Sequence, residues 1–352
     1  MAQKLKADSF DKEAYLAGYH RRLDLYDVVR RDGWPPAPMV RSAEIILGDT
    51  CNARCVFCCA HKKMGDWLPE ARAFELLEDA RRRGNELIVF SGGEPTVCPY
   101  IVPLVARARE LGFSIIEFMS NGLRFAKRGF AGKLAAAGLT MVKVSVHGAD
   151  PATHDALTGV RGAFAMALKG IDNLNWAGVY TSTNLAINRL NYRQLPLYSD
   201  LFVGRMGLTG FCFYFGFYSG KFSEDGNLQV PYSAVLPSLK LTLEYLRVRK
   251  VRIDWKFLGN FVPCLLPECE NVMIDWGADY KNRNNSVSAG GGDSRPVSRI
   301  YDDRKTRLPK CRGCVYSGVC YGVDRLYLEK YGDGEFEPVK KERKQLFQPV
   351  YW

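Results

Sequence analysis

The sequence Cys51-Asn52-Ala53-Arg54-Cys55-Val56-Phe57-Cys58 decides the fold, because it sets what the first loop of the protein must hold. It follows an apolar run at residues 43–47 and places three thiols within eight residues. Three thiolates in so short a loop can bind three corners of an iron–sulfur cube, which normally takes four cysteines. Cys59 follows Cys58 directly, so we expect its side chain to point elsewhere. One iron is then left open to a substrate or cofactor.

Other metal centres fit the same loop. A zinc site needs four nitrogen or sulfur ligands, and His61 is available as the fourth. An ordinary ferredoxin cluster is a further alternative, although its cysteine spacing differs. The chain of 352 residues has eleven cysteines, four of them at residues 51–59 and five between Cys264 and Cys320. This clustering and the odd total indicate metal ligation rather than a set of disulfides.

The sequence around this loop alternates apolar runs with helical patterns. We expect six strands, and each lies too far from the next for a hairpin, so they should be parallel and covered on both faces. The predicted strands are residues 43–47, 86–90, 114–119, 141–146, 180–187 and 210–217. The predicted helices are residues 70–83, 101–111 and 129–137, one helix that ends near 175, and residues 192–202.

The predicted fold is of the α/β class, a partial (β/α)6 TIM-like barrel with a C-terminal, cysteine-rich iron–sulfur extension. We divide the chain into a helical segment at 1–42, a barrel at 43–220 and a C-terminal region at 221–352. Within the last region we expect a helix over 235–248. The stretch 281–298 is rich in Asn, Ser and Gly, which predicts a mobile surface loop.

Polar motifs follow several of these strands at the point where each strand ends. In such folds the active site lies at the carboxyl ends of the strands, so these motifs should share one edge. Each of them alone is a weak signal, and His147 alone is more often structural. Their shared order along the barrel is what favours a common site. The motifs are Gly92-Gly93-Glu94, Ser120-Asn121 and Ser145 to His147, together with Asn184, which lies on the fifth predicted strand.

The triplet Cys-x3-Cys-x2-Cys, with Phe57 before its third cysteine, resembles the signature of the radical S-adenosylmethionine (SAM) superfamily. Gly92-Gly93-Glu94 resembles the family segment that meets the SAM amino group, and Ser120-Asn121-Gly122 resembles the one that contacts ribose and carboxylate. The fourth and fifth strands are similar to those of a branch that includes the molybdopterin GTP cyclase and peptide-modifying maturases. The resemblance implies a [4Fe–4S] cluster on Cys51, Cys55 and Cys58. It implies SAM contacts at Phe57, Gly92, Gly93, Glu94, Ser120, Asn121, Ser145 and Asn184.

The same resemblance implies a reaction class. In this family the open iron chelates SAM, an electron enters the cluster and the sulfonium C–S bond breaks. The 5′-deoxyadenosyl radical that forms abstracts hydrogen from a substrate. An electron donor such as flavodoxin or ferredoxin is expected. Beyond the cluster we assign no catalytic residue.

A second cysteine group lies near the C-terminus, at Cys311, Cys314 and Cys320. Its spacing alone suits either zinc or an iron–sulfur cluster. Beside the first motif, it resembles the auxiliary-cluster extensions called SPASM or twitch domains. The resemblance implies a second [4Fe–4S] cluster, for which we expect Cys264 as the fourth ligand and hold Cys269 in reserve.

Charge and hydropathy limit the partners. The net charge is +11, but the Lys and Arg residues are scattered and no nucleic-acid-binding module is present, so the excess favours an anionic substrate only mildly. No apolar run approaches the roughly 18 residues of a membrane span. The polar N-terminus fits no signal or transit peptide, so we expect a cytoplasmic protein.

Three functions follow from these observations. The first is a radical SAM enzyme that acts on a small molecule derived from a nucleotide, sugar or amino acid, in natural-product or cofactor biosynthesis. The second is a maturase of a ribosomally synthesised peptide. We prefer the first, because only about 42 residues precede the first strand and leader-binding domains are larger. The third is a non-enzyme, an iron–sulfur electron carrier or a zinc-stabilised binding module.

Overall fold

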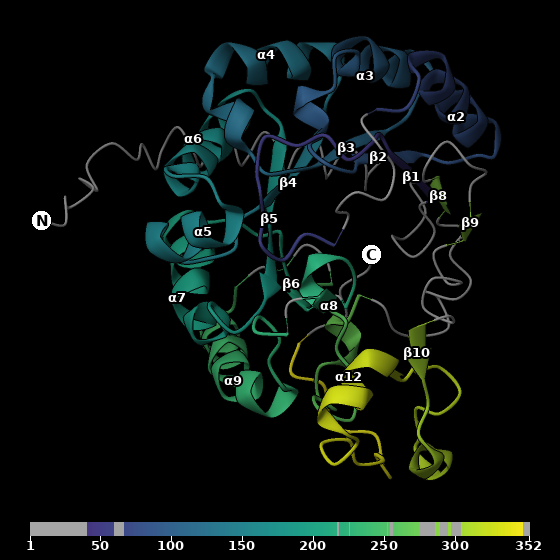
Figure 1. Ribbon diagram of the computed structural model, residues 1–352, viewed down its shortest axis with the longest axis vertical. Coiled ribbons are helices and arrows are strands. Elements are labelled where there is room, and N and C mark those ends of the chain that lie inside the picture. The colour runs from purple at the N-terminus through teal and green to yellow at the C-terminus, as the bar shows by residue number, and fades with distance from the viewer. Residues whose placement is uncertain are drawn as a thin grey trace, which may run out of the picture.

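The computed structural model describes residues 41–59, 67–216, 218–224, 226–251, 253, 256–274, 286–288, 295–296 and 304–347. The predicted N-terminal helical segment therefore lies almost wholly outside the described residues, and so do His61 and most of the stretch 281–298. Figure 1 shows a curved sheet with helices along its outer side, and a C-terminal part that contains α12 and β10 next to it.

Seven neighbouring strands of the sheet are parallel and follow the chain order, so the predicted partial barrel is confirmed. Each predicted strand is present within two residues of its expected ends. The strands are β1 (Ser42–Ile46), β2 (Leu87–Ser91), β3 (Ile115–Ser120), β4 (Met141–Ser145), β5 (Tyr180–Ile187), β6 (Phe211–Phe215) and the two-residue β7 (Leu258–Gly259). β7 was not predicted, because two residues carry no periodic pattern.

Helices cover the outer face of this sheet, as the apolar runs predict. In α2, Ala73, Leu77 and Ala80 recur at helical spacing and are buried on one side. The helices along this side are α2 (Glu70–Arg82), α3 (Ile101–Glu110), α4 (Arg128–Ala137), α5 (Pro151–Thr158), α6 (Ala163–Trp176), α7 (Leu195–Ser199) and α9 (Tyr232–Val248). Two further helices, α8 (Lys221–Glu224) and α12 (Arg325–Tyr331), lie outside this layer (Figure 1).

The prediction of one helix between the fourth and fifth strands was wrong. The structure has two helices there, α5 and α6, because the chain turns at Gly159 and Gly162 with φ of +67° and +79°. Glycine adopts this left-handed conformation without steric cost and so ends α5. Asp150 caps the start of α5, where its carboxylate accepts a hydrogen bond from the Thr153 amide at 2.8 Å.

Part of the predicted surface loop at 281–298 is also different in the structure. Residues 286–288 form β8 (Ser286–Ser288), which pairs in parallel with β1, and β9 (Arg295–Pro296) pairs antiparallel with β8. These strands satisfy backbone groups that β1 would otherwise leave unpaired at the edge of the sheet. Further on, β10 (Lys305–Thr306) and β11 (Val323–Asp324) form a small separate sheet. Among the described helices, none is both long enough and apolar enough to cross a membrane.

Successive residues of each strand face opposite sides of the sheet. Ile45, Phe90, Phe118 and Val144 pack into the main core, beneath the helices. The residues that alternate with these along each strand, such as Glu117 on β3, face the inner side of the curved sheet. The inner side therefore carries polar groups, whereas the outer side is apolar.

Candidate cluster and SAM site

The cysteine loop that follows β1 is held from two sides. The backbone amides of Arg54 and Val56 donate to the carbonyls of Thr158 and Leu157 at the end of α5, at 2.9 and 3.0 Å. On the other side, the Lys221 amide donates to the Cys58 carbonyl at 3.0 Å. The loop that carries Cys51, Cys55 and Cys58 is thus attached to the fold at both ends rather than free.

Two glycines allow this close attachment. A Cβ at Gly220 would lie 2.6 Å from the Cys58 carbonyl oxygen, and one at Gly159 would lie 2.9 Å from that of Arg54. Both positions also have positive φ. Any larger residue there would push the cysteine loop away from its supports.

The three thiols of the loop lie close enough to influence one another. Burial, together with the neighbouring Cys51 and Cys58, raises the pKa of Cys55 to about 12. The pKa of Cys51 is raised chiefly by burial, although the Ala53 amide donates to its sulfur at 3.4 Å. Such thiols stay protonated at neutral pH unless a cation stabilises the thiolates, as iron does when it binds. The donor set therefore fits an iron–sulfur cluster.

The glycine motif after β2 approaches this loop directly. The Gly93 amide donates to Gly48 at 2.6 Å, and the Glu94 amide donates to Thr50 at 2.9 Å. A Cβ at Gly93 would overlap the Thr50 carbonyl, and Gly92 has a φ of +121°. We predicted that these glycines let the backbone approach a ligand. The structure gives them a further role, since they bring the loops after β1 and β2 together.

Glu94 joins the second and third strands. Its buried carboxylate accepts hydrogen bonds from the Thr96 amide and hydroxyl at 3.1 and 2.6 Å, from the Ser120 hydroxyl at 2.7 Å, and from the Asn121 amide at 2.7 Å. Burial raises the pKa of Glu94, and these hydrogen bonds oppose that rise. The carboxylate therefore accepts most of its hydrogen bonds from the protein itself, a role that the sequence did not predict.

Asn121 connects the hydrogen bonds around Glu94 to the cysteine loop. Its side-chain amide donates to Asn52 Oδ1 at 2.7 Å and lies 3.8 Å from Cys51 Sγ, while its own oxygen accepts from the Leu123 amide at 3.1 Å. The predicted SAM-contacting residues Glu94, Ser120 and Asn121 thus form one connected set that reaches Cys51.

Ser145 and Asn184 are brought together on neighbouring strands, where they are direct partners in the register of β4 and β5. Both are half-buried. The side-chain oxygen of Asn184 is buried and has no hydrogen-bond partner in the part of the chain that the structure describes. A buried oxygen without a partner costs free energy, so a polar ligand at this edge would satisfy it.

Phe57 and His147 form an edge-to-face pair with ring centroids 4.6 Å apart. His147 Nδ1 accepts from the Ala186 amide at 3.2 Å, and the His147 amide donates to His154 Nδ1 at 2.9 Å. Burial lowers the pKa of His147 to about 3 and that of His154 to about 4. Both imidazoles are therefore neutral and structural, and His147 packs against Phe57 within the cysteine loop.

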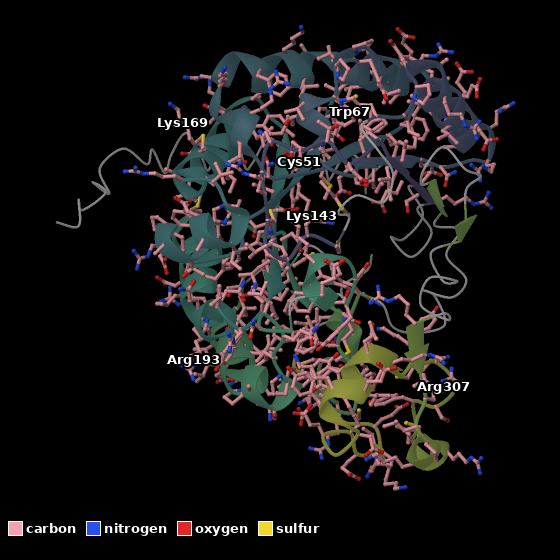
Figure 2. The ribbon with its side chains drawn as sticks, in the orientation of Figure 1. Cys51, Trp67, Lys143, Lys169, Arg193 and Arg307 are labelled. Atoms are coloured by element: carbon pink, nitrogen blue, oxygen red, sulfur yellow. The ribbon has the colours of Figure 1, made fainter. Side chains whose placement is uncertain are left out.

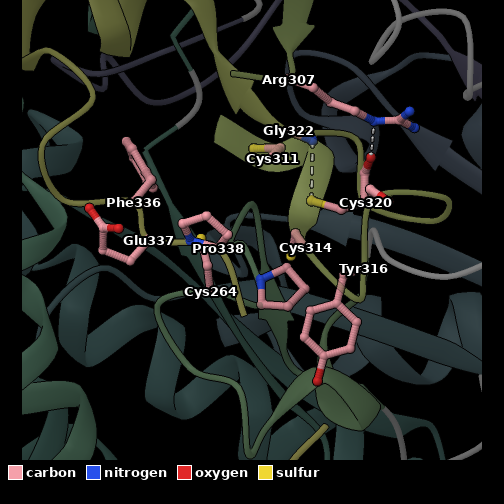
Figure 3. Close-up of a pocket in the computed structure, with 12 residues that line it drawn as sticks. Cys264, Arg307, Cys311, Cys314, Tyr316, Cys320, Gly322, Phe336, Glu337 and Pro338 are labelled. Carbon is pink, nitrogen blue, oxygen red and sulfur yellow. Dashed lines mark hydrogen bonds between the residues drawn. The ribbon is translucent and has the colours of Figure 1, made fainter. Parts of the chain in front are cut away.

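The second cysteine group surrounds a separate hollow (Figure 3). Cys264, Cys311, Cys314 and Cys320 all line it, and burial together with the other three thiols raises the pKa of Cys264 to about 12. Cys269 does not line the hollow, and its pKa is raised by burial and by Glu268 and Glu270 instead. The structure thus gathers Cys264, not Cys269, with the three downstream cysteines.

Neighbouring residues of the C-terminal region hold Cys320 of this second group in place. Arg307 Nε donates to the Cys320 carbonyl at 2.8 Å, and the Gly322 amide donates to Cys320 Sγ at 3.3 Å (Figure 3). Within the described ranges, no three His, Cys, Asp or Glu side chains are arranged to share a single metal ion. The four thiols stand around a space instead, and a set of four cysteines is the usual ligand set of a [4Fe–4S] cluster.

Comparison with known proteins agrees with this geometry. Residues 45–196 match the model of the radical SAM superfamily. The chain is 34% identical over 204 residues to the Fe-coproporphyrin III synthase of Methanosarcina barkeri, a match that covers 57% of this chain and 50% of that protein. It is 26% identical over 334 residues to an AdoMet-dependent heme synthase of the same organism, covering 84% of this chain and 94% of the relative. The chain spans about half the length, or less, of the curated relatives that it matches at 30% identity or more.

A solved structure shows the same fold. The SuiB protein of Streptococcus suis, in its structure bound to S-adenosylmethionine, superposes with a TM-score of 0.63 at 17% identity, covering 90% of this chain and 80% of that one. The cysteine loop, the polar motifs at one edge of a parallel barrel, the cysteine-rich extension and the matched family model all agree. By this match, residues 45–196 of the chain form a radical SAM domain.

Proposed function

We propose that this protein binds a [4Fe–4S] cluster through Cys51, Cys55 and Cys58 and uses it to cleave SAM. The observation that carries the proposal is the connected carboxyl edge of the barrel. Cys51, Asn121 and Glu94 are linked there by hydrogen bonds, and the unpartnered oxygen of Asn184 lies on the same edge. When bound, the cluster and SAM supply an electron and a 5′-deoxyadenosyl radical that removes hydrogen from a substrate.

The residues of the chain orient these groups and keep them in place. The loop supports at Thr158 and Lys221 hold the three thiols at the open end of the barrel. Ser145 and Asn184 present polar atoms to SAM, and Phe57, packed on His147, offers an apolar surface for its adenine. Glu94 acts mainly through Ser120 and Asn121, whose positions it fixes.

The second cysteine group would hold an auxiliary [4Fe–4S] cluster. With Cys264 beside Cys311, Cys314 and Cys320, each corner of the cube has a thiolate ligand. A fully ligated cluster has no open iron for a substrate, so we assign it to electron transfer. We place the protein in the cytoplasm, with flavodoxin or ferredoxin as its electron donor.

The substrate that we favour is a small molecule in a cofactor or natural-product pathway. The relatives that match by sequence support this choice, because the synthases named above act in small-molecule biosynthesis by their names. The second candidate is a ribosomally synthesised peptide. It is favoured by the likeness in fold to SuiB, which has also been solved bound to its precursor peptide SuiA.

Anaerobic reconstitution followed by dithionite and SAM tests the function. We expect 5′-deoxyadenosine from the wild-type protein and from Cys59→Ala, whose cysteine lies in the same loop but is not assigned to the cluster. We expect none from Cys55→Ala. A wild-type protein that forms no more 5′-deoxyadenosine than Cys55→Ala would refute the proposal.

A further inference from the structure

A charged patch lies on the inner side of the barrel and has no part in the proposed SAM site. It consists of Glu44 on β1, Glu117 on β3, Lys143 on β4 and Ser182 on β5, and we call it the lumen patch. Lys143 Nζ lies 3.2 Å from Glu117 Oε1, and the side chains are 15% and 5% exposed. Glu44 accepts a hydrogen bond from the Ser91 hydroxyl. Lys143 is near the middle of the molecule in Figure 2.

The register of the strands places these side chains side by side. Lys143 is the direct partner of Ser182 across β4 and β5, and Met119 is its partner across β3 and β4. Glu44 and Glu117 both pair with Val89 on the strand between them. Because partners in a parallel ladder point to the same face, the patch extends over the five neighbouring strands from β1 to β5, with Val89 on β2 between its two glutamates.

Two polar atoms of the lumen patch lack hydrogen bonds. The Ser182 hydroxyl is buried and has no partner, and Glu117 Oε1 has none beyond its ion pair with Lys143, within the described part of the chain. Ser182 is 0% exposed. A buried polar atom without a hydrogen bond is costly, so these atoms are expected to meet a ligand.

Stability alone does not account for the lumen patch. A buried ion pair is often no better for stability than apolar residues of the same volume, because removing the charges from water costs free energy. Burial also raises the pKa of Glu44, and the nearby Glu117 raises it further. A set of charges kept at such a cost, with unpartnered atoms beside it, points to a binding role.

The lumen patch also lies where a substrate would meet SAM. Lys143 and Ser182 are each two residues below Ser145 and Asn184 on their strands, which at about 3.3 Å per residue is roughly 7 Å deeper in the barrel. Met119, next to Lys143, is 36% exposed although it lies on a strand of the sheet. It lies level with Lys143 and two residues nearer the carboxyl end of β3 than Glu117, so it offers an apolar contact beside the charges.

We propose that the lumen patch binds the positively charged amine of the substrate, and that Met119 contacts the apolar stem that carries it. Two carboxyl groups and the Ser182 hydroxyl face one lysine in the patch, so oxygen acceptors outnumber its single cation and suit an ammonium group. Glu117 Oε1, which has only its ion pair with Lys143, and the unpartnered Ser182 hydroxyl accept its N–H groups. This proposal rests on the proposed function and narrows its substrate to an amine, as in an amino-acid-derived metabolite.

The test uses two probes of the same shape and opposite charge, n-butylammonium and butyrate. Their binding to the reconstituted, SAM-loaded protein is measured by ligand-observed NMR. We expect butylammonium to bind the wild-type protein and butyrate to bind at least about tenfold more weakly. Glu117→Gln should weaken butylammonium binding about tenfold or more, since an ammonium loses a charged acceptor. Glu110→Gln, which changes an exposed carboxylate on α3, should leave it unchanged.

Binding of butyrate as tight as that of butylammonium would overturn the proposal, as would butylammonium binding that Glu117→Gln leaves unchanged. The iron content and melting temperature of Glu117→Gln show that the variant is folded. The probes report binding and not turnover. If the protein failed to cleave SAM, the proposed function would fall while this measurement still gave its own answer.

Discussion

Replacing Glu94 with glutamine tests whether this carboxylate holds the site together or serves only as an acceptor for SAM. Glutamine has nearly the same shape, but one of its two terminal atoms is an N–H donor. Three donors, from Thr96 and Ser120, meet Glu94 Oε1, and one donor, the Asn121 amide, meets Oε2. Every protein partner of the carboxylate is thus a donor, and the glutamine amide must face at least one of them.

The cost follows from these contacts. The favourable orientation keeps the carbonyl oxygen toward Thr96 and Ser120 and sets the amide against the Asn121 N–H. One buried donor left without an acceptor costs about 1–3 kcal/mol. The other three hydrogen bonds lose their charge, which roughly halves their strength. Relief from burying a charge offsets part of this loss. We expect Glu94→Gln to lower the free energy of unfolding by about 2–3 kcal/mol.

The assay is urea unfolding of the metal-free, reduced protein under anaerobic conditions, followed by tryptophan fluorescence. Glu110→Gln is the matched control, because Glu110 is an exposed partner of Arg107 on α3. We expect the control to unfold like the wild type. If Glu94→Gln also unfolded like the wild type and lost only SAM affinity, the carboxylate would act on the ligand and our account of its structural role would be wrong.

Three further predictions follow. The folded pKa values of His147 and His154, about 3 and 4, lie below the unfolded value of 6.5. Below pH 6.5 the unfolded chain therefore binds more protons than the folded one, and the free energy of unfolding decreases as the pH is lowered, by about 2 kcal/mol per imidazole at pH 5. Urea unfolding at pH 7 and at pH 5 should show a smaller decrease for His154→Gln than for the wild type. Gly93→Ala should reduce iron incorporation, measured after reconstitution, because its Cβ would displace the loop after β1. Cys264→Ala should lose roughly four irons per chain and Cys269→Ala none, by iron analysis; the reverse result would reassign the fourth ligand.

The strands and most helices could be predicted because their apolar patterns are long enough to identify. Tyr180–Ile187 has the predicted bounds, and α2 ends one residue before its predicted end. β7, β8 and β9 were missed because two or three residues have no periodic pattern, and their pairing is decided by the edges of the sheet. The break at Gly159 has a visible signal, a glycine pair in a helical pattern, that the prediction did not use.

The candidate site was predicted as a set of residues but not as a set of contacts. The order of the motifs along a parallel barrel places Asn121 and Asn184 on one edge, because strand ends meet there. The motif order does not show that the Glu94 carboxylate accepts hydrogen bonds from Ser120 and Asn121, since those contacts depend on the packing of two loops. The choice between Cys264 and Cys269 likewise depends on folding over some fifty residues of chain.

The central claim is that two cysteine groups on one chain hold two iron–sulfur clusters, one of which binds SAM. Iron and sulfide analysis of the anaerobically reconstituted protein tests it most directly, for the wild type, Cys55→Ala and Cys314→Ala. We predict about eight irons per chain in the wild type and about four in each variant, with SAM altering the electron paramagnetic resonance signal of reduced Cys314→Ala but not of reduced Cys55→Ala. About four irons together with a zinc in the wild type, or a SAM-sensitive signal in Cys55→Ala, would contradict the claim.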